Sequence, residues 1–149
     1  MHFIYQIDTK PVEGIVRYVS KDYALDFEPI QVSCYEVLIG DLTMYADENF
    51  QVRQVWGYNP MHGWRKQKLT QPTAKKGGLY FADPNTDGHL RRIEGTQDWK
   101  TYYDVVSGWI CFGDCSARDG DDAIEFATNA IAVLHAAKIK ALWLRPVIV

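Results

Sequence analysis

The sequence has no long hydrophobic run and few cysteines. No stretch approaches the roughly 20 consecutive apolar residues of a transmembrane helix, so we expect no membrane association. The first residues, MHFIYQID, lack the basic segment and the apolar stretch of a signal peptide. The three cysteines, Cys34, Cys111 and Cys115, are odd in number and do not have the spacing of a disulfide framework. Together these absences predict a cytoplasmic protein.

The chain also lacks a strong charge bias. Its 16 basic and 19 acidic residues give a net charge of −3, which argues against a general nucleic-acid-binding protein. No internal repeat, low-complexity segment or linker interrupts the 149 residues. A chain of this length can bury a hydrophobic core without disulfides. We therefore expect a single domain over residues 1–149, and we do not expect nucleic acid as a partner.

Common catalytic motifs are missing as well. The sequence contains no P-loop, no glycine fingerprint of a dinucleotide-binding fold, no nucleophile elbow and no zinc-protease helix. We expect no cofactor. A catalytic site assembled from distant residues would leave no such motif, so the sequence favours a non-enzymatic protein without excluding an enzyme.

Aromatic residues are plentiful, and most of the chain has the pattern of β-strands. Aromatic residues make up 13% of the sequence, a composition that favours strands and binding surfaces. Residues 15–20 fit either a helix or a strand, and we favour a strand. Short turns between neighbouring segments predict antiparallel pairing. Further strands are predicted at 3–7, 32–39, 42–46, 50–56, 78–82, 89–93, 102–106, 109–112 and 139–144.

Residues 122–137 predict a long C-terminal helix. Apolar residues recur at helical spacing from Ile124 to Leu134, and Asp122 followed by Glu125 is similar to a capping box. The polar strip is narrow, so this helix should lie buried against a sheet. We therefore expect an α+β fold, in which an antiparallel sheet of hairpins or a meander carries this one helix and a final strand follows it.

Residues 83–94 have the spacing of a calcium-binding loop. Their sequence, DPNTDGHLRRIE, matches the pattern D-x-[DN]-x-[DN]-G-x5-E, and in this respect the segment resembles the EF-hand loop. The resemblance implies calcium ligands at Asp83, Asn85, Asp87 and Glu94. The flanking segments, however, predict strands rather than helices. We favour the alternative, a β-hairpin loop rich in turn-forming residues.

Residues 57–77 predict an irregular loop with a basic and aromatic composition. Prolines and glycines interrupt it, and long irregular segments inside a domain are often functional. Aromatic and arginine side chains are the types that dominate interface energies. A solvated loop without a partner is the simpler alternative. The residues expected to contact a partner are Trp56, Tyr58, His62, Trp64, Arg65, Lys66 and Lys68.

Two residues are candidates for catalysis, and each would need a neighbouring acid. His62 lies between aromatic residues in the 57–77 loop, and Cys115 precedes the predicted helix. Ordinary loop packing is the alternative for both side chains. Acids near Cys115 also suit the positive end of a helix dipole. These acids are Asp114, Asp119, Asp121 and Asp122.

The sequence thus predicts a small binding protein that is non-enzymatic and acts through contact with another protein, for example an immunity- or inhibitor-type protein. One alternative is a small-molecule enzyme that uses His62 or Cys115 with nearby carboxylates. Another is a calcium-binding module at 83–94. The sequence makes no prediction of the oligomeric state.

Overall fold

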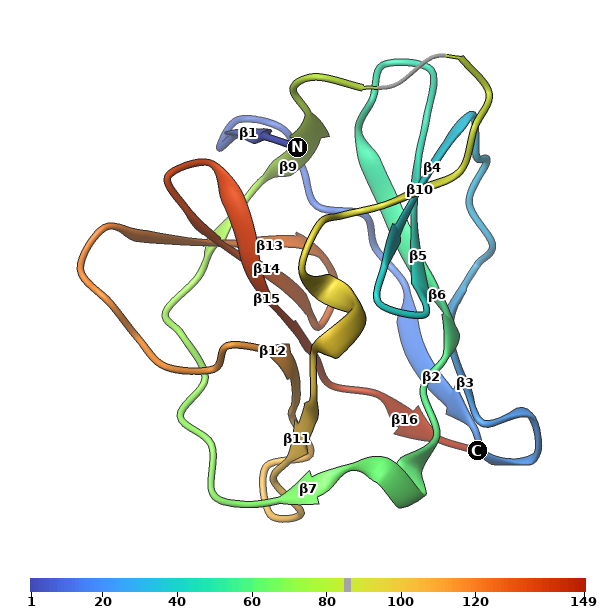
Figure 1. The fold of residues 1–149 in the computed structure, drawn as a ribbon, viewed down its shortest axis with the longest axis vertical. Helices are drawn as coiled ribbons and strands as arrows, with labels where there is room; N and C mark the ends of the chain where they lie inside the picture. Colours follow the sequence, from blue (N-terminus) through green and yellow to red (C-terminus); the bar gives the residue numbers. More distant parts are fainter. Residues whose placement is uncertain (85–86) are drawn as a thin grey trace.

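The computed structural model describes residues 1–84 and 87–149 of the chain. These residues form sixteen β-strands and three single-turn 3-10 helices, η1 (Ser20–Asp22), η2 (Met61–Gly63) and η3 (Thr96–Asp98) (Figure 1). Two seven-stranded sheets face one another, and a two-stranded sheet of β1 (Phe3–Gln6) and β9 (Gly78–Phe81) lies beside them. None of the described helices is long and apolar enough to cross a bilayer.

The first large sheet contains most of the N-terminal part of the chain. Its strand order is β10-β4-β5-β6-β3-β2-β16. The central neighbours pair antiparallel, and a short strand pairs parallel at each edge. The strands are β2 (Ile15–Val19), β3 (Ala24–Glu28), β4 (Tyr35–Ile39), β5 (Leu42–Ala46), β6 (Val52–Tyr58), β10 (Arg91–Arg92) and β16 (Val147–Ile148).

The second large sheet contains most of the C-terminal part. Its strand order is β7-β11-β12-β15-β14-β13-β8. Again the interior is antiparallel, and the two edge strands, β7 and β8, pair parallel. The strands are β7 (Arg65–Lys66), β8 (Lys75–Lys76), β11 (Thr101–Tyr103), β12 (Ile110–Gly113), β13 (Asp121–Ala127), β14 (Ala130–His135) and β15 (Lys138–Leu144).

The segment between β7 and β8, residues 67–74, is here called the strap. It connects two strands at opposite edges of the second sheet, and Figure 1 shows it as the green segment that leaves β7. Leu69 and Ala74 of the strap pack against a small apolar cluster on that sheet. The strap therefore crosses the face of the second sheet that points away from the first.

The main core lies between the two large sheets. It joins residues of the first sheet, such as Leu25 and Met44, to residues of the second, such as Phe126 and Leu142. The second sheet is buried on its other face too. That face carries the small cluster of Trp109, Cys111, Ala123, Ile131, Val133, Ala141 and Trp143.

The helix predicted over 122–137 is wrong, and with it the α+β fold class, because the described chain is nearly all β. These residues form β13 and β14, which pair antiparallel. Tight turns replace the expected helix interior. Asn129 has a φ of 59° in the first turn, and Ala136 and Ala137 have φ values of 50° and 64° in the turn before β15.

The physical reason for this error is burial on both faces. Every residue of β14 from Ala130 to Leu134 is buried, because the main core covers one face of the sheet and the small cluster covers the other. A strand covered on both sides has no polar alternation. Its unbroken apolar run, rich in alanine, then has the same appearance as a buried helix.

Most predicted strands lie close to observed ones, but one pair has other partners. The strands predicted at 78–82 and 89–93 do not form a hairpin with each other. Instead β9 pairs with β1, and β10 pairs with β4. The strands β1 and β4 lie far from β9 and β10 in the sequence. The composition of the turn between β9 and β10 therefore could not predict these pairings.

Candidate functional site

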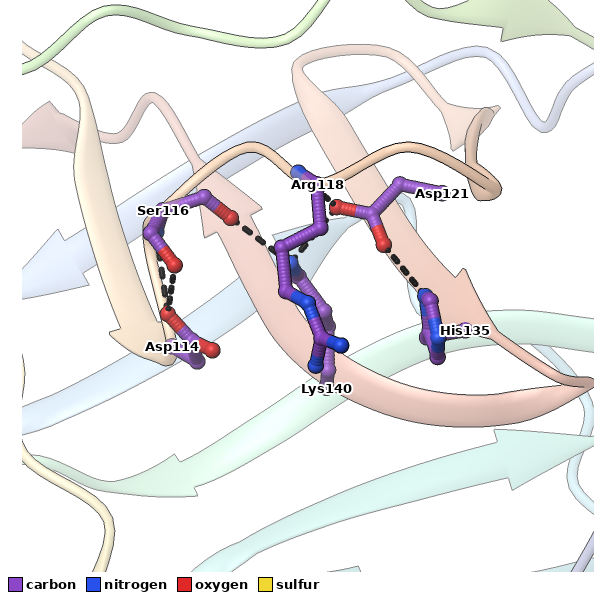
Figure 2. A network of polar contacts seen from close by, with 6 residues as sticks. All are labelled: Asp114, Ser116, Arg118, Asp121, His135 and Lys140. Carbon is purple, nitrogen blue, oxygen red and sulfur yellow. Dashed lines mark hydrogen bonds and ion pairs between the residues drawn. The ribbon is translucent and has the colours of Figure 1, made fainter.

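A network of polar contacts is centred on Asp121, the first residue of β13 (Figure 2). Its Oδ2 lies 2.5 Å from Nζ of Lys140 and accepts a hydrogen bond of 2.9 Å from the backbone N–H of Arg118. Its Oδ1 lies 2.8 Å from Nδ1 of His135. Lys140 also donates to the carbonyl of Ser116 at 2.6 Å. One carboxylate therefore connects three strands and a loop.

The strand order explains why these residues meet. The chain leaves β12 and enters β13, and between these two strands lie β15 and β14. The connection, residues 114–120, must pass the ends of both. Lys140 is near the start of β15, and His135 is the last residue of β14. Both side chains are thus available to hold the loop that crosses their strands.

The network stabilises the ionised form of Asp121. Burial by itself would raise the pKa of this carboxyl, but hydrogen bonds from Lys140, His135 and the Arg118 backbone outweigh that effect and lower the pKa to about 2. Nearby, hydrogen bonds from the hydroxyl and the backbone of Ser116 lower the pKa of Asp114. Both carboxylates are therefore anionic and already engaged at neutral pH.

A cavity of about 570 Å³ lies between the 114–118 loop and the strap. Its apolar lining comes from Ala123, Val133 and Trp143 of the sheet and from Leu69 of the strap. Its volume is within the usual range of small-molecule sites. The polar residues of its lining include Lys68, Asp114, Cys115, Arg118, Asp121 and Lys140.

Asp104 fixes the strap beside this cavity. Its Oδ2 accepts a hydrogen bond of 2.9 Å from the backbone N–H of Leu69, and its Oδ1 accepts bonds from the backbones of Val106 and Ser107. These bonds, first of all the one from Leu69, lower the pKa of Asp104. The strap is thereby tied to the loop that follows β11.

Cys115 lies in the wall of the cavity, together with Asp114 and Asp121. Its Sγ accepts a contact of 3.8 Å from Nε2 of Gln67, and its thiol interacts with that of Cys111. Cys111 is fully buried, and burial raises the pKa of its thiol. Of the four acids expected near Cys115, Asp114 and Asp121 therefore share its cavity, and Asp119 and Asp122 do not line it. The contacts of the Cys115 thiol are with an amide and a thiol.

Aromatic side chains gather on the outer face of the first sheet. Trp56 and Tyr58 are alternate residues of β6, and they are 40% and 51% exposed. The ring of Tyr45 lies 6.2 Å from that of Trp56. Tyr23, which adjoins the partner strand of Tyr58, is 50% exposed and lies 6.0 Å from the ring of His62. We call these five residues the aromatic face.

Of the seven residues predicted to contact a partner, three belong to this face: Trp56, Tyr58 and His62. Arg65 and Lys66 are exposed on the edge strand β7, and exposed Lys68 lies in the strap. These six residues therefore do not form one site: three lie on the aromatic face, two lie on the edge strand β7, and Lys68 lies in the wall of the cavity.

Trp64 differs from the rest of the set because it is buried, with 8% of its surface exposed. Its ring packs edge-on against Tyr18 and Tyr103 at 5.0 and 5.2 Å. Its Nε1 donates to Oδ1 of Asn59 at 2.6 Å. Trp64 therefore belongs to the core, and little of its side chain is accessible at the surface.

The candidate calcium ligands have other contacts. Asp83 accepts a hydrogen bond of 2.7 Å from the backbone N–H of His2, and Asp87 forms an ion pair of 2.7 Å with Arg91. Glu94 follows β10 and is exposed, and Asn85 lies outside the described residues. Within 1–84 and 87–149, no three acidic, histidine or cysteine side chains come together as a metal site.

Sequence reasoning missed the partners of Asp121 and the aromatic partners of Trp56. His135 was assigned to the predicted helix and Lys140 to the predicted strand at 139–144, so nothing placed the two residues at one end of adjacent strands. Tyr23 lies in the turn before β3 and Tyr45 lies on β5, and both come close to β6 through strand pairing. Only Asp121 carried a signal, as one of the acids near Cys115.

The fold is that of a nearly all-β protein with two facing sheets, carrying a cavity on one sheet and an aromatic surface on the other. No known protein-family profile matches the chain, and no curated protein sequence matches it. Similarity to a characterised protein therefore assigns no function to either site.

Proposed function

We propose that the protein is a non-enzymatic binding protein that contacts another protein through its aromatic face. The observation that carries this proposal is the exposure of Trp56 and Tyr58 side by side on β6, with Tyr23 equally exposed beside them. Exposed large aromatic side chains in one patch are typical of interaction surfaces. Tyrosine and tryptophan are also the residues most enriched among interface hot spots.

The shape of this surface favours a protein over a small molecule. Within the described residues, Tyr58 borders only a cavity of about 120 Å³, which is smaller than a typical small-molecule site, and the other four residues of the face line none of the larger cavities. The face belongs to a paired sheet, which holds the aromatic rings in place before binding and so reduces the entropy lost on association. An immunity- or inhibitor-type protein, which covers a site on its target, is one version of this function.

The test is photo-crosslinking in cells that naturally produce the protein. A photoreactive phenylalanine derivative placed at Trp56 should crosslink one protein, identified by mass spectrometry, and the same group at Val106 should not. Val106 is the matched control because it is apolar, 93% exposed and not part of the aromatic face.

The identified protein is then purified and its affinity measured. W56A and Y58A should each weaken binding by about 2 kcal/mol if they are hot spots, and V106A should not. Equal crosslinking at both positions, or unchanged affinity of W56A and Y58A, would overturn the proposal. Loss of the partner's own activity on binding would support the inhibitor version.

We also propose that this binding occurs in the cytoplasm. The support is the odd number of cysteines and their lack of disulfide-framework spacing, because chains in an oxidising compartment typically pair their cysteines. Fractionation of the native cells should recover the chain with cytoplasmic markers. Recovery from the extracellular fraction would contradict this location.

A further inference from the structure

The cavity under the strap carries a net positive charge, and two of its basic side chains are not engaged in ion pairs within the described residues. Three basic side chains, of Lys68, Arg118 and Lys140, and two acidic ones, of Asp114 and Asp121, line it, which leaves one net positive charge. Lys140 is neutralised by Asp121 at 2.5 Å. Within the described residues, the side chains of Lys68 and Arg118 have no ion-pair partner.

This charge differs in sign from that of the whole protein, which is −3. The carboxylates of the two acids in the lining already accept hydrogen bonds from the protein. Both oxygens of Asp121 are hydrogen-bonded, and Oδ1 of Asp114 accepts two bonds from Ser116. An anion entering the cavity therefore meets available guanidinium and ammonium donors.

The floor of the cavity is apolar, and neutral polar residues of the strap and of the 114–118 loop, among them Gln67, Thr70 and Ser116, complete the lining. Val133 and Trp143 form part of the floor, and Leu69 of the strap lies against the same cluster. Asp104 holds Leu69 in place through its backbone N–H. A ligand with a hydrophobic body would contact this floor and displace water from the half-buried Leu69, whereas a ligand with only a charged group would not.

We propose that the cavity binds a small organic carboxylate with a hydrophobic body, its carboxylate at Arg118 and Lys68 and its apolar part on Trp143, Val133 and Leu69. The planar guanidinium of Arg118 can donate two parallel hydrogen bonds to a carboxylate. This site is independent of the aromatic face, because it lies on the opposite sheet.

The chain contains its own reporter for occupancy. Cys115 is half-buried in the cavity wall, Cys34 is exposed outside it, and Cys111 is fully buried. Alkylation by iodoacetamide, followed by peptide mass spectrometry, gives the reaction rate of each thiol. A ligand in the cavity should slow the reaction of Cys115 and leave that of Cys34 unchanged.

The probes are hexanoate, phenylacetate and indole-3-acetate, each compared with its neutral amide. At least one carboxylate should protect Cys115 at millimolar concentration, and its amide should bind about tenfold more weakly or not at all. Protection by no probe, or equal protection by acid and amide, would overturn the proposal.

Two variants of Arg118 and one control variant complete the test. R118Q should weaken protection by the active carboxylate about tenfold, whereas R118K should retain part of it. Lys138→Gln is the matched control, because Lys138 is exposed and does not line the cavity. The side chain of Arg118 is exposed, so R118Q should unfold at the same temperature as the wild type. Unchanged protection in R118Q would contradict the assigned carboxylate position.

Discussion

The ammonium of Lys140 lies 2.5 Å from the carboxylate of Asp121, and the two side chains are only 12% and 13% exposed. Lys140 comes from the start of β15 and Asp121 from the start of β13, with β14 between them. The pair spans one strand and fixes the loop that enters β13. Because removal of one partner leaves the other charge buried and unpaired, this contact affects stability more than an exposed ion pair would.

Replacement of Asp121 by asparagine should destabilise the fold. D121N keeps the shape of the side chain but loses the charge that faces Lys140 and His135. We expect the free energy of unfolding to fall by about 1–3 kcal/mol, measured by urea denaturation. D119N is the matched control, because Asp119 is an exposed acid of the same loop. Equal stabilities of D121N and D119N would show that the network contributes little.

Asp121 should also make stability depend on pH in the acid range. Its pKa in the folded protein is about 2, below its ordinary value of 3.8, so folding favours the deprotonated form. The resulting stabilisation is complete above the unfolded pKa and is lost as the pH falls from about 4 towards 2. Thermal unfolding between pH 5 and 2 should therefore show a smaller acid-induced loss in D121N than in the wild type.

A variant of the partner tests the cause of this lowered pKa. Lys140→Met removes the cation beside Asp121, so the pKa of Asp121 should rise towards its ordinary value. NMR titration of the side-chain carboxyl carbon measures the change directly. An unchanged pKa in this variant would assign the effect to His135 and the Arg118 backbone instead.

Glycine at Ala137 should stabilise the protein. Ala137 has a φ of 64° in the turn between β14 and β15, a conformation that costs alanine energy and glycine almost none. We expect A137G to raise the free energy of unfolding by about 0.5–1 kcal/mol. In a helix the same change would lower it by about 1 kcal/mol. The sign therefore distinguishes the hairpin from the helix, and A117G, at an exposed loop position without positive φ, is the control.

Truncation of two tryptophans should differ in its cost to stability. W64A removes a ring buried between Tyr18 and Tyr103, so it should lower the free energy of unfolding by about 3–5 kcal/mol. W56A truncates a ring that is 40% exposed and should cost about 1 kcal/mol or less. Urea denaturation of both variants measures the difference. A costly W56A would indicate that the aromatic face has a structural role.

Asp104→Asn should loosen the strap. The charged acceptor for the backbone N–H of Leu69 would become a neutral amide, which weakens that hydrogen bond. Hydrogen exchange at the Leu69 amide should become about tenfold faster, corresponding to about 1.4 kcal/mol of local opening. D98N, at an exposed acid of η3, should leave this exchange rate unchanged.

Local patterns in the sequence predicted much of the strand content. The prediction at 42–46 has the bounds of β5, and the hairpin of 102–106 with 109–112 corresponds to the antiparallel pair of β11 and β12. In these segments turn-forming residues lie next to apolar residues, so neighbours in sequence are also neighbours in the sheet. The same local signals correctly placed Cys115 in a loop beside several acids.

Other features had no local signal. The strand β14 looked helical because both of its faces are buried, and that burial comes from distant parts of the chain, including the strap. Trp64 and Trp56 have similar basic and aromatic surroundings in the sequence, yet one is buried and the other exposed. Composition does not distinguish them, because the side of the sheet that faces the core depends on non-local pairing.

By itself, the sequence determined that most of this chain before residue 122 forms strands joined by short polar turns, because alternation and turn chemistry act between near neighbours. Tertiary structure decided which strands pair, which faces are covered, and that Asp121, His135 and Lys140 meet at one end of three strands. It also placed the strap over the second sheet and created the cavity beneath it. Those outcomes depend on the free energy of contacts between segments that are distant in the sequence. A short window of sequence includes only one side of each such contact, so it cannot predict them.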